Sequence, residues 1–316
     1  MAEIVTRDNF VEAETAHYIR EQLDKAPVNT YFHNRVPVNV DNQVIIRSNV
    51  DLIYSYAVVD VTEEASFSLA PSQEYQVAQV IDENHYVVAV VYPGQTRTVR
   101  NDELSAGNHV YALGRTATTG GLDHALQLQD ARGITAATSN SYSGREFDDE
   151  SRKAVGAELE THAAEADFSK AFGTPASTDP YQHLLGARLG WGGLPPEHAQ
   201  YYQGLATSTG AEVWTFELPP LDYEHNGYFS VIKYDEMGWL DVERPGLSDN
   251  ELARNPDGTI SIWFGDERVA GEANVIRATE GQKFYYGIRL YRPLDAQETV
   301  EYIATLRSAG LTPSRK

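Results

Sequence analysis

The chain has 316 residues, 41% of them hydrophobic, which is enough for one large domain or two ordinary ones with sizeable cores. Its formal net charge of −21 disfavours nucleic acids and anionic membrane surfaces as partners, because binding to either depends on positive charge. The sequence contains no cysteine, which excludes disulfides, thiolate metal sites and cysteine nucleophiles.

The first residues do not resemble a secretory signal peptide, because residues 1–22 lack a continuous apolar region. No segment approaches the roughly 20 consecutive apolar residues that a membrane helix needs. We therefore expect a soluble, cytoplasmic protein with no membrane partner.

The N-terminal part is predicted to be rich in strands. Residues 10–23 have an apolar face and are predicted to form a helix. Between residues 36 and 116, short segments rich in Val, Ile, Tyr and Thr alternate with turn-forming residues, which is typical of strands. Residues 121–134 have leucine and alanine at helical spacing. We expect an N-terminal β-rich domain over residues 1–135.

Composition changes after this region. Residues 135–150 are small and polar and predict a loop, and residues 150–166 predict a surface helix. The stretch "LGWGGLPPEHAQYY" then combines glycines and prolines. We expect residues 136–200 to form a polar and helical connector that ends in a Gly/Pro-rich junction.

The last part again predicts strands. Apolar and polar residues alternate in "EVWTFELP", "GYFSVIKYD", "TISIWFG" and "KFYYGIRLYRP". A final helix is predicted between Asp295, which resembles a capping residue, and Gly310. We expect residues 201–316 to form an antiparallel β-sandwich with a terminal helix. The predicted fold class is therefore α+β, mainly β, without alternating βαβ units.

Several common catalytic motifs are absent. The sequence has no H-E-x-x-H pair, no G-x-S-x-G turn and no phosphate-binding loop ending in G-K-[ST]. In the absence of cysteine, a metal site needs histidine together with carboxylates, and no such spacing is present. We expect no tightly bound transition metal and no cofactor.

A polar cluster interrupts the apolar run from Val44 to Val61. It includes Arg47, Asn49, Asp51, Tyr54 and Ser55. One interpretation is a turn in which Asn and Asp bond nearby amides and Arg47 pairs with Asp51. The other is the wall of a ligand pocket, since buried polar groups must satisfy one another or face a cavity. The local sequence alone favours the turn.

Two further positions allow a structural and a functional interpretation. His85 precedes the most apolar strand of the N-terminal part and is either a hydrogen-bonded histidine or a general base. Trp191, between glycines, either lines a cleft or plugs the junction between the two β-rich parts. In each case the structural interpretation is favoured.

Aromatic residues recur on the C-terminal strands. They predict a sandwich core, with a carbohydrate-binding platform as the alternative. Arg289 lies among them and is expected to form a structural ion pair before it serves as a substrate clamp.

These stretches together resemble two families. "DNQVIIRSNVDLIYSYAVVDV", "QVIDENHYVVAVVYPG" and "GRTATTGGLDHALQLQD" resemble the family called domain of unknown function 1254. "LGWGGLPPEHAQYY", "NPDGTISIWFG" and "YYGIRLYRP" resemble its usual C-terminal companion, domain of unknown function 1214. The resemblance covers most of residues 1–135 and 185–293. It implies a jelly-roll-like C-terminal sandwich, but no secure activity and no known cofactor.

The resemblance favours the interpretation of the polar cluster as part of a site. The pattern R-x-N-x-D-x-x-Y-S, residues 47–55, and the pair His85–Tyr86 are hallmarks of it. The chain departs from the usual pattern at Leu52, where the family often has threonine, and after Asn274, where it usually has an aromatic residue and a proline. If that later segment shapes a pocket, the pocket of this protein differs there.

Two classes of function follow as hypotheses. The first is an enzyme that acts on a small organic molecule by acid–base chemistry, such as hydrolysis or elimination, in a pocket between the two β-rich parts. Its expected catalytic residues are His85 and Asp51, and its expected ligand-binding residues are Arg47, Asn49, Tyr54, Ser55, Tyr86, Trp191 and Asn274. In this hypothesis Arg47 lowers the pKa of Asp51 and His85 moves the proton. The second is a non-catalytic module that binds a ligand or another subunit. Both hypotheses leave open whether the protein forms a homo-oligomer.

Overall fold

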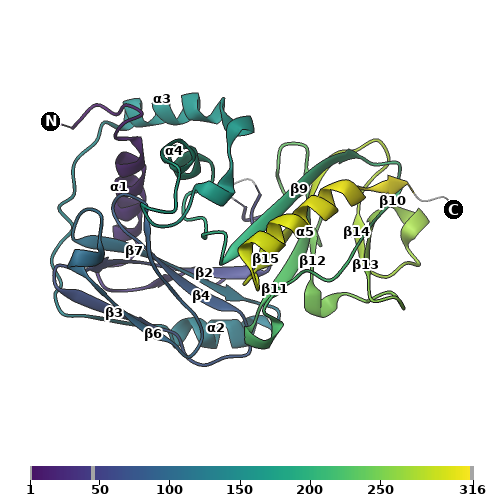
Figure 1. Cartoon of the computed structure of the whole chain (residues 1–316), viewed down its shortest axis with the longest axis horizontal. Helices are drawn as coiled ribbons and strands as arrows, with labels where there is room; N and C mark the ends of the chain where they lie inside the picture. The colour runs from purple at the N-terminus through teal and green to yellow at the C-terminus, as the bar shows by residue number, and fades with distance from the viewer. Residues whose placement is uncertain (1, 44–46, 314–316) are drawn as a thin grey trace. The chain divides into compact units, whose positions relative to one another are not determined.

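The computed structural model describes residues 2–43 and 47–313 and divides the chain into two compact units (Figure 1). The first unit contains Met1–Arg35 and Ile53–Pro196, and the second contains Val36–Leu52 and Glu197–Lys316. Among the described residues, no helix combines the length and the apolar character that a membrane crossing requires. The chain is mainly β, with several antiparallel sheets, as predicted.

The first unit contains two sheets. The larger has five strands in the order β1-β2-β7-β4-β5, and the smaller has three in the order β6-β3-β8. Their bounds are β1 Phe32–His33, β2 Leu52–Asp60, β3 Glu64–Ser68, β4 Gln76–Ile81, β5 Val87–Val91, β6 Thr96–Arg100, β7 His109–Ala117 and β8 Gly133–Ala136. The expected strand residues Val44, Ile45 and Ile46 lie outside the described part of the chain.

Strand β2 is apolar on both faces because both faces are packed against other parts of the unit. Ala57 and Val59 point into a core that the two sheets share. Tyr56 and Val58, on the opposite face, pack with Ile19 of the first helix. Because side chains alternate along a strand, a strand covered on both sides needs apolar residues at nearly every position.

Helices cover the other face of the five-stranded sheet. The helices of this unit are α1 Phe10–Leu23, α2 Leu122–Asp130, α3 Asp149–Glu160 and α4 Pro180–Leu189. Figure 1 shows α1, α3 and α4 grouped on one side of the sheet, and they share an apolar cluster that includes Phe10, Leu159 and Leu185. Helix α4 begins where Asp179 accepts hydrogen bonds from the next two free amides, with proline at the first helical position.

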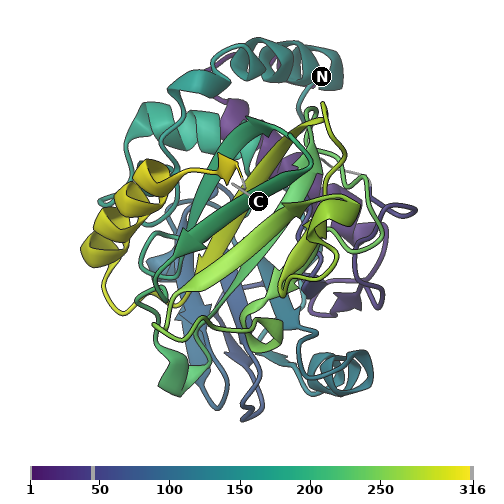
Figure 2. The same cartoon turned by 90° about the vertical axis from the view of Figure 1, so that its right-hand side faces the viewer.

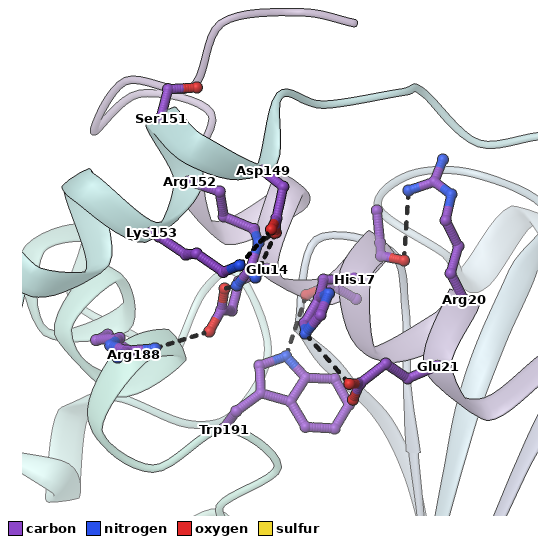
Figure 3. Close-up of polar contacts among 12 residues, drawn as sticks. Glu14, His17, Arg20, Glu21, Asp149, Ser151, Arg152, Lys153, Arg188 and Trp191 are labelled. Carbon is purple, nitrogen blue, oxygen red and sulfur yellow. Dashed lines mark hydrogen bonds and ion pairs between the residues drawn. The ribbon is translucent and has the colours of Figure 1, made fainter.

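A buried ion-pair network also joins these helices (Figure 3). Glu14 of α1 binds Arg152 of α3 and lies 3.4 Å from Arg188 of α4. Arg152 also contacts Asp149 at 2.7 Å. Helix α3 was predicted to be a surface helix, but it buries Arg152 and Leu159.

The second unit is a sandwich of two four-stranded sheets, in the orders β12-β11-β15-β9 and β14-β13-β10-β16. The bounds are β9 Ala199–Thr207, β10 Ala211–Phe216, β11 Tyr228–Asp235, β12 Gly246–Ser248, β13 Ile260–Gly265, β14 Val275–Arg277, β15 Lys283–Tyr291 and β16 Thr312–Pro313. One core joins both sheets and includes Trp214, Phe229, Phe264 and Phe284. These aromatic residues fill the core as expected, as does Tyr286, whereas Trp239 after β11 is exposed.

Two details of this unit differ from or extend the prediction. The strands were expected to be wholly antiparallel, but β13 and β14 pair in parallel. Helix α5 Ala296–Ala309 begins after Asp295, whose carboxylate caps two free amides. Leu306 of this helix enters the sandwich core, and Figure 2 shows the helix beside the strands of its unit.

The division of the chain differs from the expected domain boundaries. Residues 136–196, expected to form a connector, belong to the first unit, and α3 and α4 supply part of its core. Residues 36–52, expected in the N-terminal domain, belong to the second unit. The reason is packing: Val38, Val40 and Val50 contact Ile232, Tyr234 and Leu240.

Candidate functional site

The polar cluster around Asp51 is divided between the two units. Strand β2 begins at Leu52, so Asn49 and Asp51 precede it. The side-chain oxygen of Asn49 accepts the amide N–H of Asp51 at 2.7 Å, which is the local bond expected of a turn. The side-chain amide of Asn49 donates to the Tyr291 hydroxyl at 2.7 Å. Asn49 therefore anchors the turn to strand β15 of the second unit.

Asp51 lies buried against the same sheet. Ser230, Ser248 and Arg289 lie close enough to its carboxyl group to lower its pKa. Burial outweighs these contacts and raises the pKa of Asp51 above its usual value. The sequence had led us to expect a lowered pKa for Asp51, and that prediction is wrong.

Among the described residues, Arg47 does not form the expected ion pair with Asp51. Its side chain is exposed, and its guanidinium lies over the ring of Tyr285, 5.3 Å from the centroid. Its carbonyl oxygen accepts a hydrogen bond from Arg289. Arg47 therefore contributes to the turn mainly through its backbone, which has the positive φ of 55°.

Tyr54 and Ser55 lie on opposite faces of β2 in the first unit, as strand alternation predicts. Tyr54 stacks on Tyr56 with ring centroids 6.1 Å apart. The fully buried hydroxyl of Ser55 lies 2.8 Å from Nδ1 of His33 and accepts a hydrogen bond from Gln129 at 3.2 Å. Tyr54 and Ser55 therefore belong to the first unit, whereas Asn49 and Asp51 belong to the second.

His85 is a buried turn residue of the first unit. It has the positive φ of 66°, and its backbone amide donates to the carbonyl of Asp82 at 2.9 Å. Its Nε2 accepts the amide N–H of Gly192 at 2.9 Å, so this nitrogen carries no proton. Burial, with a smaller effect of His183, holds the pKa of His85 well below its usual value. These contacts are those of a structural, neutral histidine.

The glycine-rich loop around Trp191 is held by side chains of the first unit. Arg115 donates to the carbonyl of Gly192 at 2.6 Å, and Gln79 donates to that of Gly193 at 2.8 Å. Gly192 has φ of 75°, and a Cβ there would lie 2.7 Å from a methyl group of Leu113, so glycine is required.

Trp191 itself fills space within that unit. Its ring lies 4.4 Å from Tyr18, 5.1 Å from His85 and 4.9 Å from Tyr111, measured between centroids. Its indole N–H donates to the Thr15 hydroxyl at 3.2 Å. The ring contacts described for Trp191 all lie inside the first unit, so the side chain contributes to the packing of that unit.

The remaining expected ligand-binding residues also have structural partners. Tyr86 stacks on His183 with centroids 4.4 Å apart. Asn274, with φ of 56°, exchanges two hydrogen bonds with the backbone of Ala253, at 2.8 and 2.7 Å. Asn274 therefore joins two loops of the second unit.

The segment after Asn274 lines a groove in the second unit. The groove has a volume of about 760 Å³ and is open on one side. Its walls come from the loop after β11 and from β14 with the loop that follows it. The lining residues are Asp241, Val242, Glu243, Arg244, Val275, Arg277, Thr279, Glu280 and Gln282.

A buried lysine lies behind the wall of this groove. The side chain of Lys233 is fully buried, and its ammonium group donates to both carboxylate oxygens of Asp241 at 2.7 Å. Gln282 also donates to Asp241. Burial is the largest influence on Lys233 and lowers its pKa, while the bond to Asp241 opposes the shift. Asp241 keeps 19% of its side chain exposed, so it joins the groove to the buried cation.

This pair was not predicted from the sequence, although one signal was present. Residues 228–235 form a strand in which Phe229, Val231 and Lys233 share a face. A lysine in line with two core residues indicates a buried cation that needs a partner. The position of Asp241 could not be predicted, because it depends on the path of the loop after β11.

The described residues contain no group of three or more histidine and carboxylate side chains placed to hold a metal ion. The groove lining combines two arginines with three carboxylates, so it can bind polar ligands through charge-assisted hydrogen bonds.

Comparisons with known proteins identify the fold. No protein-family model matches the chain, and neither does any curated protein sequence. The VPA0106 protein from Vibrio parahaemolyticus has a similar crystal structure, with a TM-score of 0.69 and 16% identity over 94% of this chain and 96% of that one. An uncharacterized protein from Burkholderia cenocepacia is similar with a TM-score of 0.54 and 13% identity, over 91% and 85% of the two chains. At these identities, the comparisons show a shared fold alone.

Proposed function

We propose that the protein is an enzyme that acts on a small polar organic molecule by acid–base chemistry, and that its reaction takes place in the groove of the second unit. The observation that carries this proposal is the pair formed by Lys233 and Asp241. A titratable group that is buried, perturbed and paired with one partner beside a cavity is a common feature of active sites.

The two side chains have different roles in this proposal. Asp241 faces the groove and accepts a proton from the bound molecule or from water. Lys233 holds the carboxylate in one orientation and stabilises its charge. Because burial lowers its pKa, Lys233 gives up a proton more readily than an exposed lysine does. Arg244 and Arg277 supply donors for an anionic group of the ligand.

A non-catalytic ligand-binding protein is the second candidate. The groove is open on one side, and the side chains of Arg244 and Arg277 are 66% and 70% exposed. Such an accessible lining suits reversible binding of a charged ligand as well as catalysis. The resemblance to the two domains of unknown function and the jelly-roll-like course of the sandwich belong to the same proposal, and both rest on the sequence motifs.

The test is an incubation of the pure protein with a metabolite extract, followed by mass spectrometry of retained and consumed compounds. The variants are Asp241→Asn and Lys233→Met, with melting curves to confirm folding. Lys153→Met is the matched control, because it removes an exposed lysine that pairs with Asp149 in the first unit.

Consumption that is lost in both groove variants and retained in the control supports the enzyme. Retention of a compound without consumption, abolished by Asp241→Asn, supports the binding protein. If every variant retains and consumes the same compounds as the natural protein, the groove is not the site and the proposal fails.

A further inference from the structure

Arg132 is a buried cation at one end of the core between the two sheets of the first unit. Arg132 is 8% exposed. Its guanidinium donates to the carbonyl oxygens of Val77 at 3.2 Å and Arg115 at 2.6 Å, and to the Thr116 hydroxyl at 2.7 Å. All three acceptors are neutral. Within residues 2–43 and 47–313, no carboxylate forms an ion pair with Arg132.

The Gln76 side chain is next to the Thr116 hydroxyl that this guanidinium binds. It is fully buried, and in the antiparallel pair of β4 and β7 it lies opposite Thr116. Residues that face one another in this way have neighbouring side chains, and Thr116 is bound by Arg132. Among the described residues, neither the nitrogen nor the oxygen of the Gln76 amide has a hydrogen-bond partner.

The two observations together describe an incomplete site. A buried guanidinium without a counter-charge is costly, and so is a buried amide without a hydrogen bond. The burial of Arg132 is large enough to lower its pKa to about 10. The Tyr31 hydroxyl acts on the same guanidinium electrostatically and has no hydrogen-bond partner among the described residues, so it adds an O–H donor. Donors and positive charge therefore converge where a negative charge is missing.

We infer that a small monoanion, a halide or a carboxylate of the size of formate, binds between the Arg132 guanidinium and the Gln76 amide. The size follows from the close packing around the cation. A Cβ on Gly114 would lie 2.7 Å from Arg132 and 3.1 Å from the Cβ of Ser55, so the guanidinium is tightly packed on that side and a large anion is excluded. This site belongs to the first unit and is independent of the groove function.

The test measures the melting temperature of the full chain at constant ionic strength. Gluconate, which is too large for the site, is replaced stepwise by chloride in one series and by formate in another. Binding to the folded state alone stabilises it by mass action, so the melting temperature is expected to rise by roughly 5–10 °C at 100 times the dissociation constant.

Two variants make the test specific. Gln76→Glu supplies a carboxylate of nearly the same size, so it should melt higher than the natural protein in gluconate and lose the response to chloride and formate. Arg132→Met should lose the response as well. Arg35→Met should keep it, because it removes a cation that is already paired with Asp130.

A soak of wild-type crystals in bromide gives a measurement that does not depend on any variant. An anomalous peak within hydrogen-bond distance of Gln76 supports the site. A water molecule in the same place would produce neither this peak nor an anion-dependent melting temperature. If the natural protein shows no response, or responds in the same way as Gln76→Glu, the inference is overturned.

Discussion

Burial acts on histidine and aspartate in opposite directions in this protein. It lowers the pKa of His85 and raises that of Asp51, because in each case the charged form loses hydration. Both side chains are therefore biased toward their neutral forms. This is a natural consequence of turns packed into apolar sheets, and for Asp51 the shift is opposite to the one expected from a pairing with Arg47.

His33 provides a measurable case of the same effect. Its pKa is lowered from 6.5 to about 4, first by burial and then by the charges of Arg35 and Arg132, while Asp130 opposes the shift. Between pH 6.5 and pH 4 the unfolded chain takes up a proton at this position and the folded chain does not. The contribution of His33 to stability is therefore complete above pH 6.5 and is lost as the pH falls towards 4.

We predict that His33→Gln reduces the pH dependence of stability over this range. The expected difference is about 1–2 kcal/mol, less than the full shift implies, because the imidazole is only half-buried and solvent screens it. Urea unfolding at pH 7.5 and pH 4.5 measures it in both proteins. The raised pKa of Asp249, about 6, has the opposite effect but is common to both. Equal pH dependence in the two proteins would contradict the prediction.

At the scale of single residues, the sequence indicated local contacts but not partners that lie far apart in the chain. The turn at Asn49 and Asp51 follows from local hydrogen bonding, which a sequence can indicate. The bond from Asn49 to Tyr291 joins positions far apart in the chain, and no local pattern encodes it. Lys233 and Asp241 were missed for the same reason.

The helices of the first unit depend on a buried network of charges as well as on apolar contacts. Glu14 is 2% exposed and Arg152 is 8% exposed, and Arg188 and Asp149 complete the set (Figure 3). A buried pair repays its loss of hydration only when both partners are present. The network therefore makes α1, α3 and α4 dependent on one another.

We predict that Glu14→Ala destabilises the protein by about 3–5 kcal/mol, because it leaves Arg152 buried without one of its two carboxylate partners. The double variant Glu14→Leu, Arg152→Met removes both charges and should lie within about 1 kcal/mol of the natural protein. Denaturant unfolding followed by circular dichroism measures both. A double variant as unstable as the single one would show that the charges themselves, and not their pairing, stabilise the helices.

At the scale of elements, periodicity predicted most strands and the terminal helix. The run from Leu52 to Asp60 is strand β2, and its apolar residues occupy both faces because both are covered. Helix α3 was assigned to the surface because charged residues dominate its sequence. Its Arg152 is nevertheless buried, since an acidic residue of another helix meets it. Such pairing depends on how the helices pack, which the sequence of α3 alone does not contain.

At the scale of the whole molecule, the two units are not two continuous segments of chain. Residues 36–52 leave the first unit, pack on the second, and return to the first through β2. The sequence suggested boundaries near residues 135 and 200, because composition changes there. Neither composition nor periodicity reports which unit a short apolar segment joins. That choice depends on Val38, Val40 and Val50 meeting the apolar residues of the sheet that contains β11.

This arrangement predicts that the second unit is incomplete without its N-terminal segment. A fragment of residues 197–316 exposes Ile232, Tyr234 and Leu240, which the segment otherwise covers. A second fragment carries residues 36–52 joined to residue 197 by a flexible Gly/Ser linker. It should melt higher and bind less of a hydrophobic dye, since covering apolar surface is the main stabilising contribution.

The control is the linked fragment with Val38, Val40 and Val50 changed to serine, which keeps the chain length and the linker but removes the apolar contacts. It should behave like the fragment of residues 197–316 alone. The three valines are partly buried, so each contributes less than the ~1.5–3 kcal/mol of a fully buried side chain, but their combined loss is still large beside the stability of a small domain. If both linked fragments melt at the same temperature, the segment stabilises the second unit through the polar turn at Asn49 and Asp51, and the apolar contacts are incidental.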